Sequence, residues 1–375
     1  MKKTRKMTRL TAMLLAAGFL LAGCGGGGGE STEQTEAVDL NSMTMEELIA
    51  GAQEEGRLET TGMPDDWANW GESWASFSEE YGIEHYDTDM ASAETVAIFA
   101  AEKDSPTKDF GDVGQAFTVT AEEQDVLQGY KVSTWDSIPD WAKDPEGRWY
   151  VTYTGTNAFL TNPNLTGGKI PETWDDVKNG DYMVSPGNVI GGASSQVAVL
   201  ACAIAYGGGL DNVQPGIDFF KELAEQGRLD PADPTRDRVA TGEVACMLAR
   251  YDFQCLSWRD EINAADPNMN LVATIPSDAS VTSGYALLFN KWAPHPCAAA
   301  LGIEYLLSDQ GQIERAKSYA RPIRSDVEIP EDIASKMLPD SAYENSTAIT
   351  DVESFAAACN EIARLWEEEV LPLIG

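Results

Sequence analysis

The sequence has little positive charge and little histidine. It carries 26 lysines and arginines against 61 aspartates and glutamates, with two histidines, in 375 residues. The formal net charge of −35 repels the phosphates of nucleic acids and anionic lipid headgroups, so no nucleic-acid partner is expected. His85 lies in an alternating segment and His295 lies between two prolines, so neither indicates a catalytic triad or a metal shell.

Catalytic sequence motifs are lacking as well. No Walker-type GxxxxGK, GxSxG or HExxH pattern occurs, and no spacing of carboxylates singles out a pair for glycoside hydrolysis. We therefore expect that the protein is not an enzyme, and that it needs no cofactor and no resident metal. A surface carbohydrate hydrolase remains the enzymatic alternative.

Long hydrophobic runs are absent and cysteines are few. The apolar stretch from Leu10 to Leu21 is shorter than the roughly 20 residues that a permanent membrane-spanning helix needs. The six cysteines are dispersed and include no CxxC pair, and both Cys202 and Cys246 lie in strongly apolar segments. A chain of this size does not depend on disulfides even in an oxidising compartment, so we predict no specific bridge.

A basic N-terminal segment precedes the apolar stretch, which ends in Leu21-Ala22-Gly23-Cys24. This order resembles the lipobox of bacterial lipoproteins, in which the cysteine is diacylated and the signal peptide is cut just before it. The resemblance implies a signal peptide over 1–23, a lipidated Cys24 and a flexible tether over 24–44. Because two acyl chains anchor a protein stably, we expect it on the extracytoplasmic face of the cell membrane. An ordinary signal peptide with an incidental cysteine is the alternative.

Residues 24–375 exceed the roughly 250–300 residues that one hydrophobic core supports, so two lobes are expected. Strand and helix patterns alternate along the chain, which predicts an α/β fold with a largely parallel sheet. The predicted strands cover 57–61, 83–86, 109–113, 149–153, 182–184, 244–249, 271–275 and 284–290. The predicted helices cover 45–55, 70–81, 92–103, 174–177, 194–206, 217–225, 236–241, 297–307 and 353–371. We expect Thr44 and Glu47 to form a capping box, Ser92 to cap its helix, and Gly155 to interrupt its strand.

Ligands of open α/β sheets bind beyond the carboxyl ends of the strands, next to helix N-termini. Polar or aromatic residues occupy such positions in five segments: 62–67, 114–117, 185–195, 251–252 and 283–285. We therefore predict a ligand cleft formed by Asp65, Asp66, Trp67, Trp70, Gln115, Phe117, Thr156, Ser194, Ser195, Tyr251, Asp252 and Tyr285.

Two of these positions indicate the chemistry of the ligand. The glycine-rich stretch before Ser194 leaves backbone N–H groups free at a helix start, which suits a carboxylate or phosphonate. Asp252, beside Tyr251, is the acidic residue that we favour for a ligand amine. A salt bridge of Asp252 with Arg250 or Arg259 is the alternative.

Three C-terminal segments resemble extracellular solute-binding proteins of ABC importers, in the group that binds ferric iron, polyamines and 2-aminoethylphosphonate: Ala293–Ala299, Tyr305–Gln312 and Ala320–Arg324. The N-terminal half carries weaker similarity to the same group in three segments: 67–72, 112–117 and 135–139. The resemblance implies a type II periplasmic-binding-protein fold, with two α/β lobes around a hinge and the ligand cleft between them. Lobe 1 would combine 45–155 with 286–375 and lobe 2 would be 156–285, with crossing strands at 153–158 and 283–287.

The resemblance also implies a function. A monomeric, membrane-anchored receptor would capture a small polar solute, close on it and deliver it to an ABC permease in the membrane. Ferric binders of the group resemble one another in two adjacent tyrosines, whereas this chain has Tyr251-Asp252. An organic amine or aminophosphonate therefore fits better than ferric iron, which stays the alternative substrate. The alternative role is a ligand-sensing ectodomain that partners a membrane signalling protein.

Overall fold

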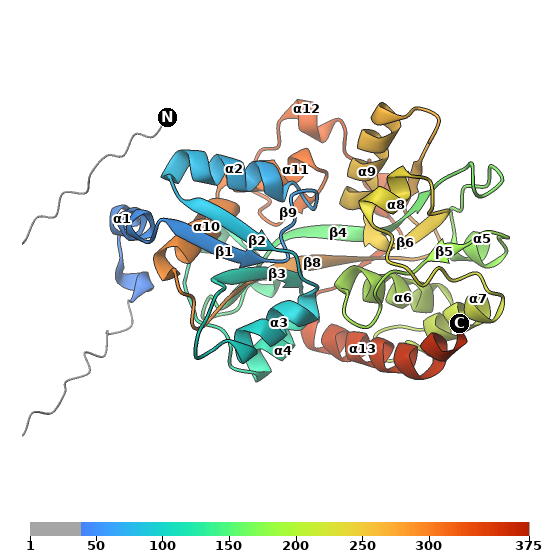
Figure 1. Ribbon diagram of the computed structural model, residues 1–375, viewed down its shortest axis with the longest axis horizontal. Helices are drawn as coiled ribbons and strands as arrows, with labels where there is room; N and C mark the ends of the chain where they lie inside the picture. Colours follow the sequence, from blue (N-terminus) through green and yellow to red (C-terminus); the bar gives the residue numbers. More distant parts are fainter. Residues whose placement is uncertain (1–38, 375) are drawn as a thin grey trace, which may run out of the picture. The chain divides into compact units, whose positions relative to one another are not determined.

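The computed structural model describes residues 39–374 (Figure 1). The predicted signal peptide, Cys24 and most of the predicted tether lie outside these residues, so the structure leaves those predictions untested. Among the described residues, no helix combines the length and the apolar character that a membrane crossing requires.

Helices and strands alternate along the described chain. The helices are α1 Met45–Glu55, α2 Trp70–Tyr81, α3 Ser92–Ala101, α4 Phe117–Glu123, α5 Trp174–Lys178, α6 Ala193–Ala205, α7 Gln214–Glu225, α8 Arg236–Ala240, α9 Asp252–Ala265, α10 Pro296–Leu307, α11 Asp309–Lys317, α12 Glu331–Ala334 and α13 Val352–Leu365. The strands are β1 Arg57–Thr61, β2 Glu84–Thr88, β3 Phe110–Gly114, β4 Trp149–Thr161, β5 Val184–Ser185, β6 Cys246–Tyr251, β7 Val272–Thr274, β8 Ser280–Phe289, β9 Arg321–Pro322 and β10 Ser346–Ala348.

A mixed sheet connects seven of these strands in the order β2-β1-β3-β8-β4-β6-β5, while β7 and β9 pair with β4 and β10 pairs with β8. β1 is parallel to β2 and β3, as predicted, whereas β3 pairs antiparallel with β8. The long strand β4 pairs with β8 over 149–156 and with β6 over 157–161. One strand therefore carries the chain from the part of the sheet around β1–β3 to the part around β5 and β6.

Helices cover both faces of the sheet on either side of this strand (Figure 1). Around β1–β3, α2 and α11 lie above the strands and α3 and α4 lie below them, as Figure 1 is drawn. Around β5 and β6, α8 and α9 lie above and α6 and α7 below. The predicted α/β class with two lobes is thus confirmed.

The C-terminal helix α13 contacts elements of both lobes. It packs against α6 and α4, and a π-helical turn, Trp366–Val370, follows it. The ring of Trp366 lies 5.3 Å from the ring of Phe220 in α7. The residue boundaries that we predict for the two lobes stay a prediction, because 286–375 touches both of them.

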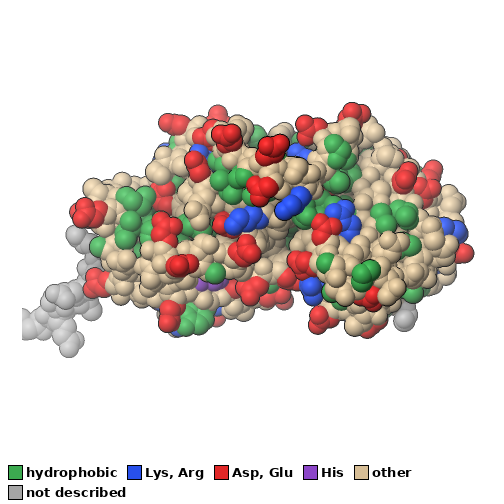
Figure 2. All heavy atoms as spheres, turned by 90° about the horizontal axis from the view of Figure 1, so that it is seen from above, with side chains coloured by type: hydrophobic (Ala, Val, Ile, Leu, Met, Phe, Trp, Pro, Cys, Tyr) green, Lys and Arg blue, Asp and Glu red, His purple; other side chains and the backbone are tan. Residues whose placement is uncertain are grey.

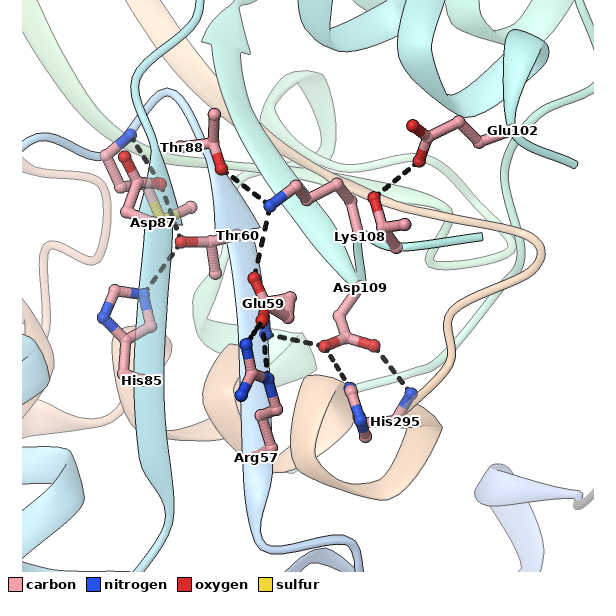
Figure 3. Close-up of polar contacts among 12 residues, drawn as sticks. Arg57, Glu59, Thr60, His85, Asp87, Thr88, Glu102, Lys108, Asp109 and His295 are labelled. Carbon is pink, nitrogen blue, oxygen red and sulfur yellow. Dashed lines mark hydrogen bonds and ion pairs between the residues drawn. The ribbon is translucent and has the colours of Figure 1, made fainter. Parts of the chain in front are cut away.

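Both histidines make structural contacts near β1 (Figure 3). His85 Nε2 lies 2.8 Å from Thr60 Oγ1, and the His85 ring stacks on Trp74 with centroids 4.3 Å apart. The backbone N–H of His295 donates to Asp109 Oδ1 at 2.7 Å, and its Nδ1 lies 2.9 Å from Asp109 Oδ2. These contacts hold β2 and the start of α10 against β1 and β3.

The predicted helix cap is confirmed at Thr44 and is wrong at Ser92. Thr44 and Glu47 form the predicted capping box. The cap of α3 is Ala91, whose N–H donates to the carboxylate of Glu94 at 2.9 Å. Ser92 Oγ instead accepts the N–H of Gly114 at 3.1 Å. The tertiary partner on β3 therefore replaces the local cap.

Two other expectations are corrected. Gly155 does not interrupt its strand, because β4 is continuous through it. A Cβ at this position would lie 2.6 Å from Cε1 of Phe253, so glycine permits the close approach of an aromatic ring. The predicted helix over 353–371 keeps regular α-helical bonding only to Leu365. Helices α4, α9 and α11 were not predicted from the sequence.

Candidate ligand-binding cleft

A cleft of about 320 Å³ opens at the carboxyl ends of β1, β3 and β6, beside the start of α6. Its position is the one expected for a ligand site of an α/β sheet. Figure 2 shows acidic side chains across the visible face of the molecule, with several basic ones near its middle. The cleft is lined by Gly62, Pro64, Asp66, Trp67, Asp89, Met90, Ala91, Ser92, Asp112, Asn188, Gly192, Ala193, Ser194, Ser195, Asp233, Thr235, Arg236, Arg250, Gln254, Trp258 and Tyr285.

Five of the residues predicted from the sequence line this cleft. They are Asp66 and Trp67 after β1, Ser194 and Ser195 at the start of α6, and Tyr285 on β8. The structure thus brings together three of the five segments that we selected at strand ends. That these side chains bind a ligand stays a prediction.

Three other predicted residues are buried and form hydrogen bonds within the fold. Gln115 accepts the N–H of Gly284 at 2.5 Å through Oε1 and donates to a backbone carbonyl through Nε2. Thr156 Oγ1 lies 2.6 Å from a threonine hydroxyl on β8, and Tyr251 Oη lies 2.6 Å from Ser283 Oγ. Gln115 and Thr156 join β8 to its neighbours, Tyr251 bridges β6 and β8 across β4, and none of the three side chains lines the cleft.

Trp70, Asp65 and Phe117 do not line the cleft either. Trp70 is fully buried, and the guanidinium of Arg315 lies 3.6 Å from the centroid of its ring. The exposed Asp65 side chain lies against the first turn of α2, next to Gly71. Phe117 is half-buried at the start of α4 and packs against the core.

Asp252 is the largest departure from the predicted site. Its side chain is 1% exposed, with Oδ1 accepting the N–H of Thr156 at 2.9 Å and Oδ2 accepting the hydroxyl of Tyr343 at 2.6 Å. Burial raises the pKa of Asp252 above its ordinary value, and these two hydrogen bonds offset only part of that rise. The carboxylate therefore connects β4 to the segment before β10, and it makes neither of the salt bridges considered as alternatives.

One side of the cleft is suited to an acid group. The N-terminus of α6 lines it and carries no side-chain cap, so its backbone N–H groups and the helix dipole favour an anion there. Arg250 also lines the cleft, with Nη2 3.4 Å from Asp233. The buried Trp258 lines the cleft too, and its indole N–H has no acceptor among the described residues.

Another part of the cleft lining is aromatic and acidic. Trp67 Nε1 donates to Tyr153 Oη at 2.8 Å, and Tyr153 Oη donates to Asp112 Oδ2 at 2.5 Å. The ring of Tyr285 stacks on that of Tyr153, with centroids 5.5 Å apart. These contacts fix the orientation of Trp67 and Tyr285, which face the ligand space with Asp66.

Several cleft residues were missed in the sequence, among them Arg236, Arg250, Asp89, Asp112 and Gln254. Arg250 was considered only as a partner of Asp252, although it ends the buried strand β6. Asp112 stands two residues before Gly114 at the end of β3, a position that the strand-end rule would have selected. Gln254 lies on α9, a helix that the sequence pattern did not reveal.

The described residues contain no group of three His, Cys, Asp or Glu side chains that is arranged to hold a metal ion. The cysteines in this part of the chain are free and buried: Cys202, Cys246, Cys255, Cys297 and Cys359. Burial raises the pKa of the Cys246 thiol to about 12, which keeps it protonated and a poor metal ligand at neutral pH.

Comparison with known proteins identifies the family of this chain. Residues 106–343 match the family of bacterial extracellular solute-binding proteins. The chain belongs to this family. A search of curated proteins by sequence found no match.

Solved structures share the fold of this solute-binding protein. The periplasmic binding protein AfuA from Actinobacillus pleuropneumoniae, with fructose-6-phosphate bound, is 17% identical, and the match covers 84% of this chain and 99% of that chain with a TM-score of 0.70. The substrate-binding protein of an ABC transporter from Agrobacterium tumefaciens is 14% identical, with 86% and 96% covered and a TM-score of 0.68. The ferric binding protein from Campylobacter jejuni is 17% identical, with 83% and 98% covered and a TM-score of 0.64. The periplasmic-binding-protein fold implied by the sequence is therefore confirmed.

Proposed function

We propose that this protein is the substrate-binding component of an ABC importer for a small solute that carries both an acid group and an amine. The observation that carries this proposal is that one cleft is lined both by hydrogen-bond donors and positive charge and by carboxylates and aromatic rings. A solute with groups of both signs would satisfy both sets of groups. Closure of the lobes would bury it, since differential binding to the closed form shifts the population toward that form.

The acid group would lie against the start of α6, next to Arg250 and Trp258. Backbone N–H groups, a guanidinium and an indole N–H are all donors, and none of them competes for the proton of an amine. The related fold of AfuA, which was solved with a sugar phosphate bound, supports an anionic group in such a cleft. Ferric iron is a weaker candidate, because Tyr251 is bonded to Ser283 away from the cleft.

Titration calorimetry with 2-aminoethylphosphonate, putrescine and spermidine tests the proposal. We expect heat with the aminophosphonate and weaker binding of the two amines, which lack the acid group. Arg250→Gln should weaken aminophosphonate binding by about 10-fold or more, as expected for the loss of a charged hydrogen bond. Arg259→Gln removes the same charge from α9 outside the cleft and serves as the control. No heat with any of the three solutes would refute the acid-and-amine assignment.

Delivery to a permease from a membrane tether completes the proposal. The lipidated Cys24 would hold the receptor near the membrane, and the tether over 24–44 would give it reach. Small-angle scattering with and without saturating 2-aminoethylphosphonate should show compaction on binding. An unchanged profile under saturating solute would contradict closure of the lobes. Metabolic labelling with a fatty acid, compared between the wild type and Cys24→Ser, tests the anchor.

A further inference from the structure

Four carboxylates line the cleft, and they differ in how far water reaches them. Asp66, Asp89 and Asp233 are exposed, and Asp233 also lies 3.4 Å from Arg250. Asp112 is 2% exposed. Because the attraction between opposite charges grows as water is excluded, a carboxylate at the position of Asp112 discriminates between a charged and a neutral partner far better than an exposed one.

One oxygen of Asp112 is left without a partner. Oδ2 accepts the hydroxyl of Tyr153, which in turn accepts the indole N–H of Trp67. Oδ1 is buried and has no hydrogen-bond donor among the described residues. Burial raises the pKa of Asp112 well above its ordinary value, although the hydrogen bond from Tyr153 and the charge of Arg315 lower it in part. A buried polar atom without a hydrogen-bond partner lowers the free energy of unfolding by roughly 1–3 kcal/mol. Most buried polar atoms in native proteins therefore have a partner, and an exception indicates a specific role.

A second buried acceptor lines the same cleft. Gln254 is 2% exposed and donates through Nε2 to the backbone carbonyl of Asp66 at 3.1 Å. Its Oε1 has no donor within the described part of the chain. Both acceptors adjoin the loop that carries Trp67, because Asp112 reaches Trp67 through Tyr153 and Gln254 is bonded to the residue before it.

We propose that Asp112 and Gln254 determine specificity by binding the donor group of the solute, a protonated amine. An ammonium has three N–H donors and can serve both acceptors, whereas a hydroxyl has one. This inference rests on the proposed function and assigns the amine to a buried carboxylate, in place of Asp252. The competing explanation is that Asp112 serves only structural contacts, with the charge of the buried Arg315 and the nearby indole of Trp70.

Three matched phosphonates test this assignment by calorimetry at one pH. Ethylphosphonate, 2-hydroxyethylphosphonate and 2-aminoethylphosphonate share the acid group and differ in the group opposite it. The wild type should bind the amine about 10- to 100-fold more tightly than the ethyl compound, with the hydroxyl compound between them. Asp112→Asn keeps an acceptor for Tyr153 and should remove most of the amine preference while ethylphosphonate binding stays. Gln254→Met should reduce the preference less. Asp65→Asn removes an exposed charge from the same loop and should leave the preference intact.

The outcomes separate this inference from the proposed function. Equal affinity of the wild type for all three compounds would overturn the role of Asp112 and Gln254, yet leave the acid-binding side standing. Equal affinity for the amine and the hydroxyl would overturn the assignment to an ammonium. An unchanged preference in Asp112→Asn would show that Oδ1 has only a structural contact. Absence of binding by all three would refute the acid-group assignment and this inference together. The wild-type comparison does not depend on whether a variant folds.

Discussion

The hydrogen bond between Tyr343 and Asp252 leads to a quantitative prediction about stability. Asp252 is 1% exposed, and the Tyr343 hydroxyl is one of the two groups that donate to its carboxylate. Tyr343→Phe removes this donor and keeps the ring, which packs under the guanidinium of Arg321 at 3.9 Å. A hydrogen bond to a charged group contributes about 1.5–3 kcal/mol, so we expect the variant to lose about that much free energy of unfolding at pH 7.

The loss should depend on pH in a definite direction. Burial already raises the folded-state pKa of Asp252, so stability falls as the pH rises from the ordinary pKa of aspartate to that raised value, above which the full cost of the charged form is present. Without the Tyr343 hydroxyl the folded-state pKa rises further, and the cost of ionising the carboxylate at pH 7 increases. Once the carboxyl is protonated the donor matters much less. The difference between the wild type and Tyr343→Phe should therefore shrink as the pH falls toward the ordinary pKa of aspartate.

Urea unfolding at pH 7 and pH 4.5, with m-values compared to confirm similar transitions, measures this difference. Tyr206→Phe is a matched control, because Tyr206 Oη donates to Asp175 Oδ1 at 2.6 Å on the exposed surface, where such a bond contributes less than about 1 kcal/mol. A Tyr343→Phe variant as mildly affected as the control, or equally destabilised at both pH values, would refute the reasoning.

Three further predictions follow from packing and charge. A Cβ at Gly114 would overlap the Cβ of Ala193, which lines the cleft. Gly114→Ala should therefore push β3 and the start of α6 apart and weaken 2-aminoethylphosphonate binding about 10-fold or more in calorimetry, while retained affinity would contradict this account. Trp70→Ala should reduce the free energy of unfolding by about 3–5 kcal/mol, measured by urea denaturation, whereas a loss below about 1 kcal/mol would mean that Trp70 is not core. The hydrogen bond to Asp109 raises the pKa of His295, so its stabilisation is present below the ordinary value of about 6.5 and is lost as the pH rises through the raised pKa. His295→Gln should accordingly be destabilised more at pH 5.5 than at pH 8.5, and the reverse order would exclude a charged histidine.

Local sequence patterns predicted most elements of the fold. Hydrophobic periodicity located α2, capping-box spacing located the start of α1, and strand runs located β1 and β3, because these signals depend on neighbours within a few residues. The helix α9 is not predicted because polar residues, Asp252 and Gln254, are buried on it, so its apolar spacing is irregular. The partners that allow their burial are distant in sequence. The prediction for Gly155 is wrong because the role of this glycine depends on the ring of Phe253, which is also distant in sequence.

The sequence by itself determined the class of the protein: an acidic, two-lobed α/β chain with strand-end segments that carry ligand-binding groups and with segments resembling solute-binding proteins. Tertiary structure alone decided which of those groups face the ligand. Trp67, Ser194 and Tyr285 line the cleft, whereas Tyr251 and Asp252 turn into the fold. The reason is that strand ends fix where a residue stands along the sheet, while the direction of its side chain and its exposure depend on the elements that pack against it.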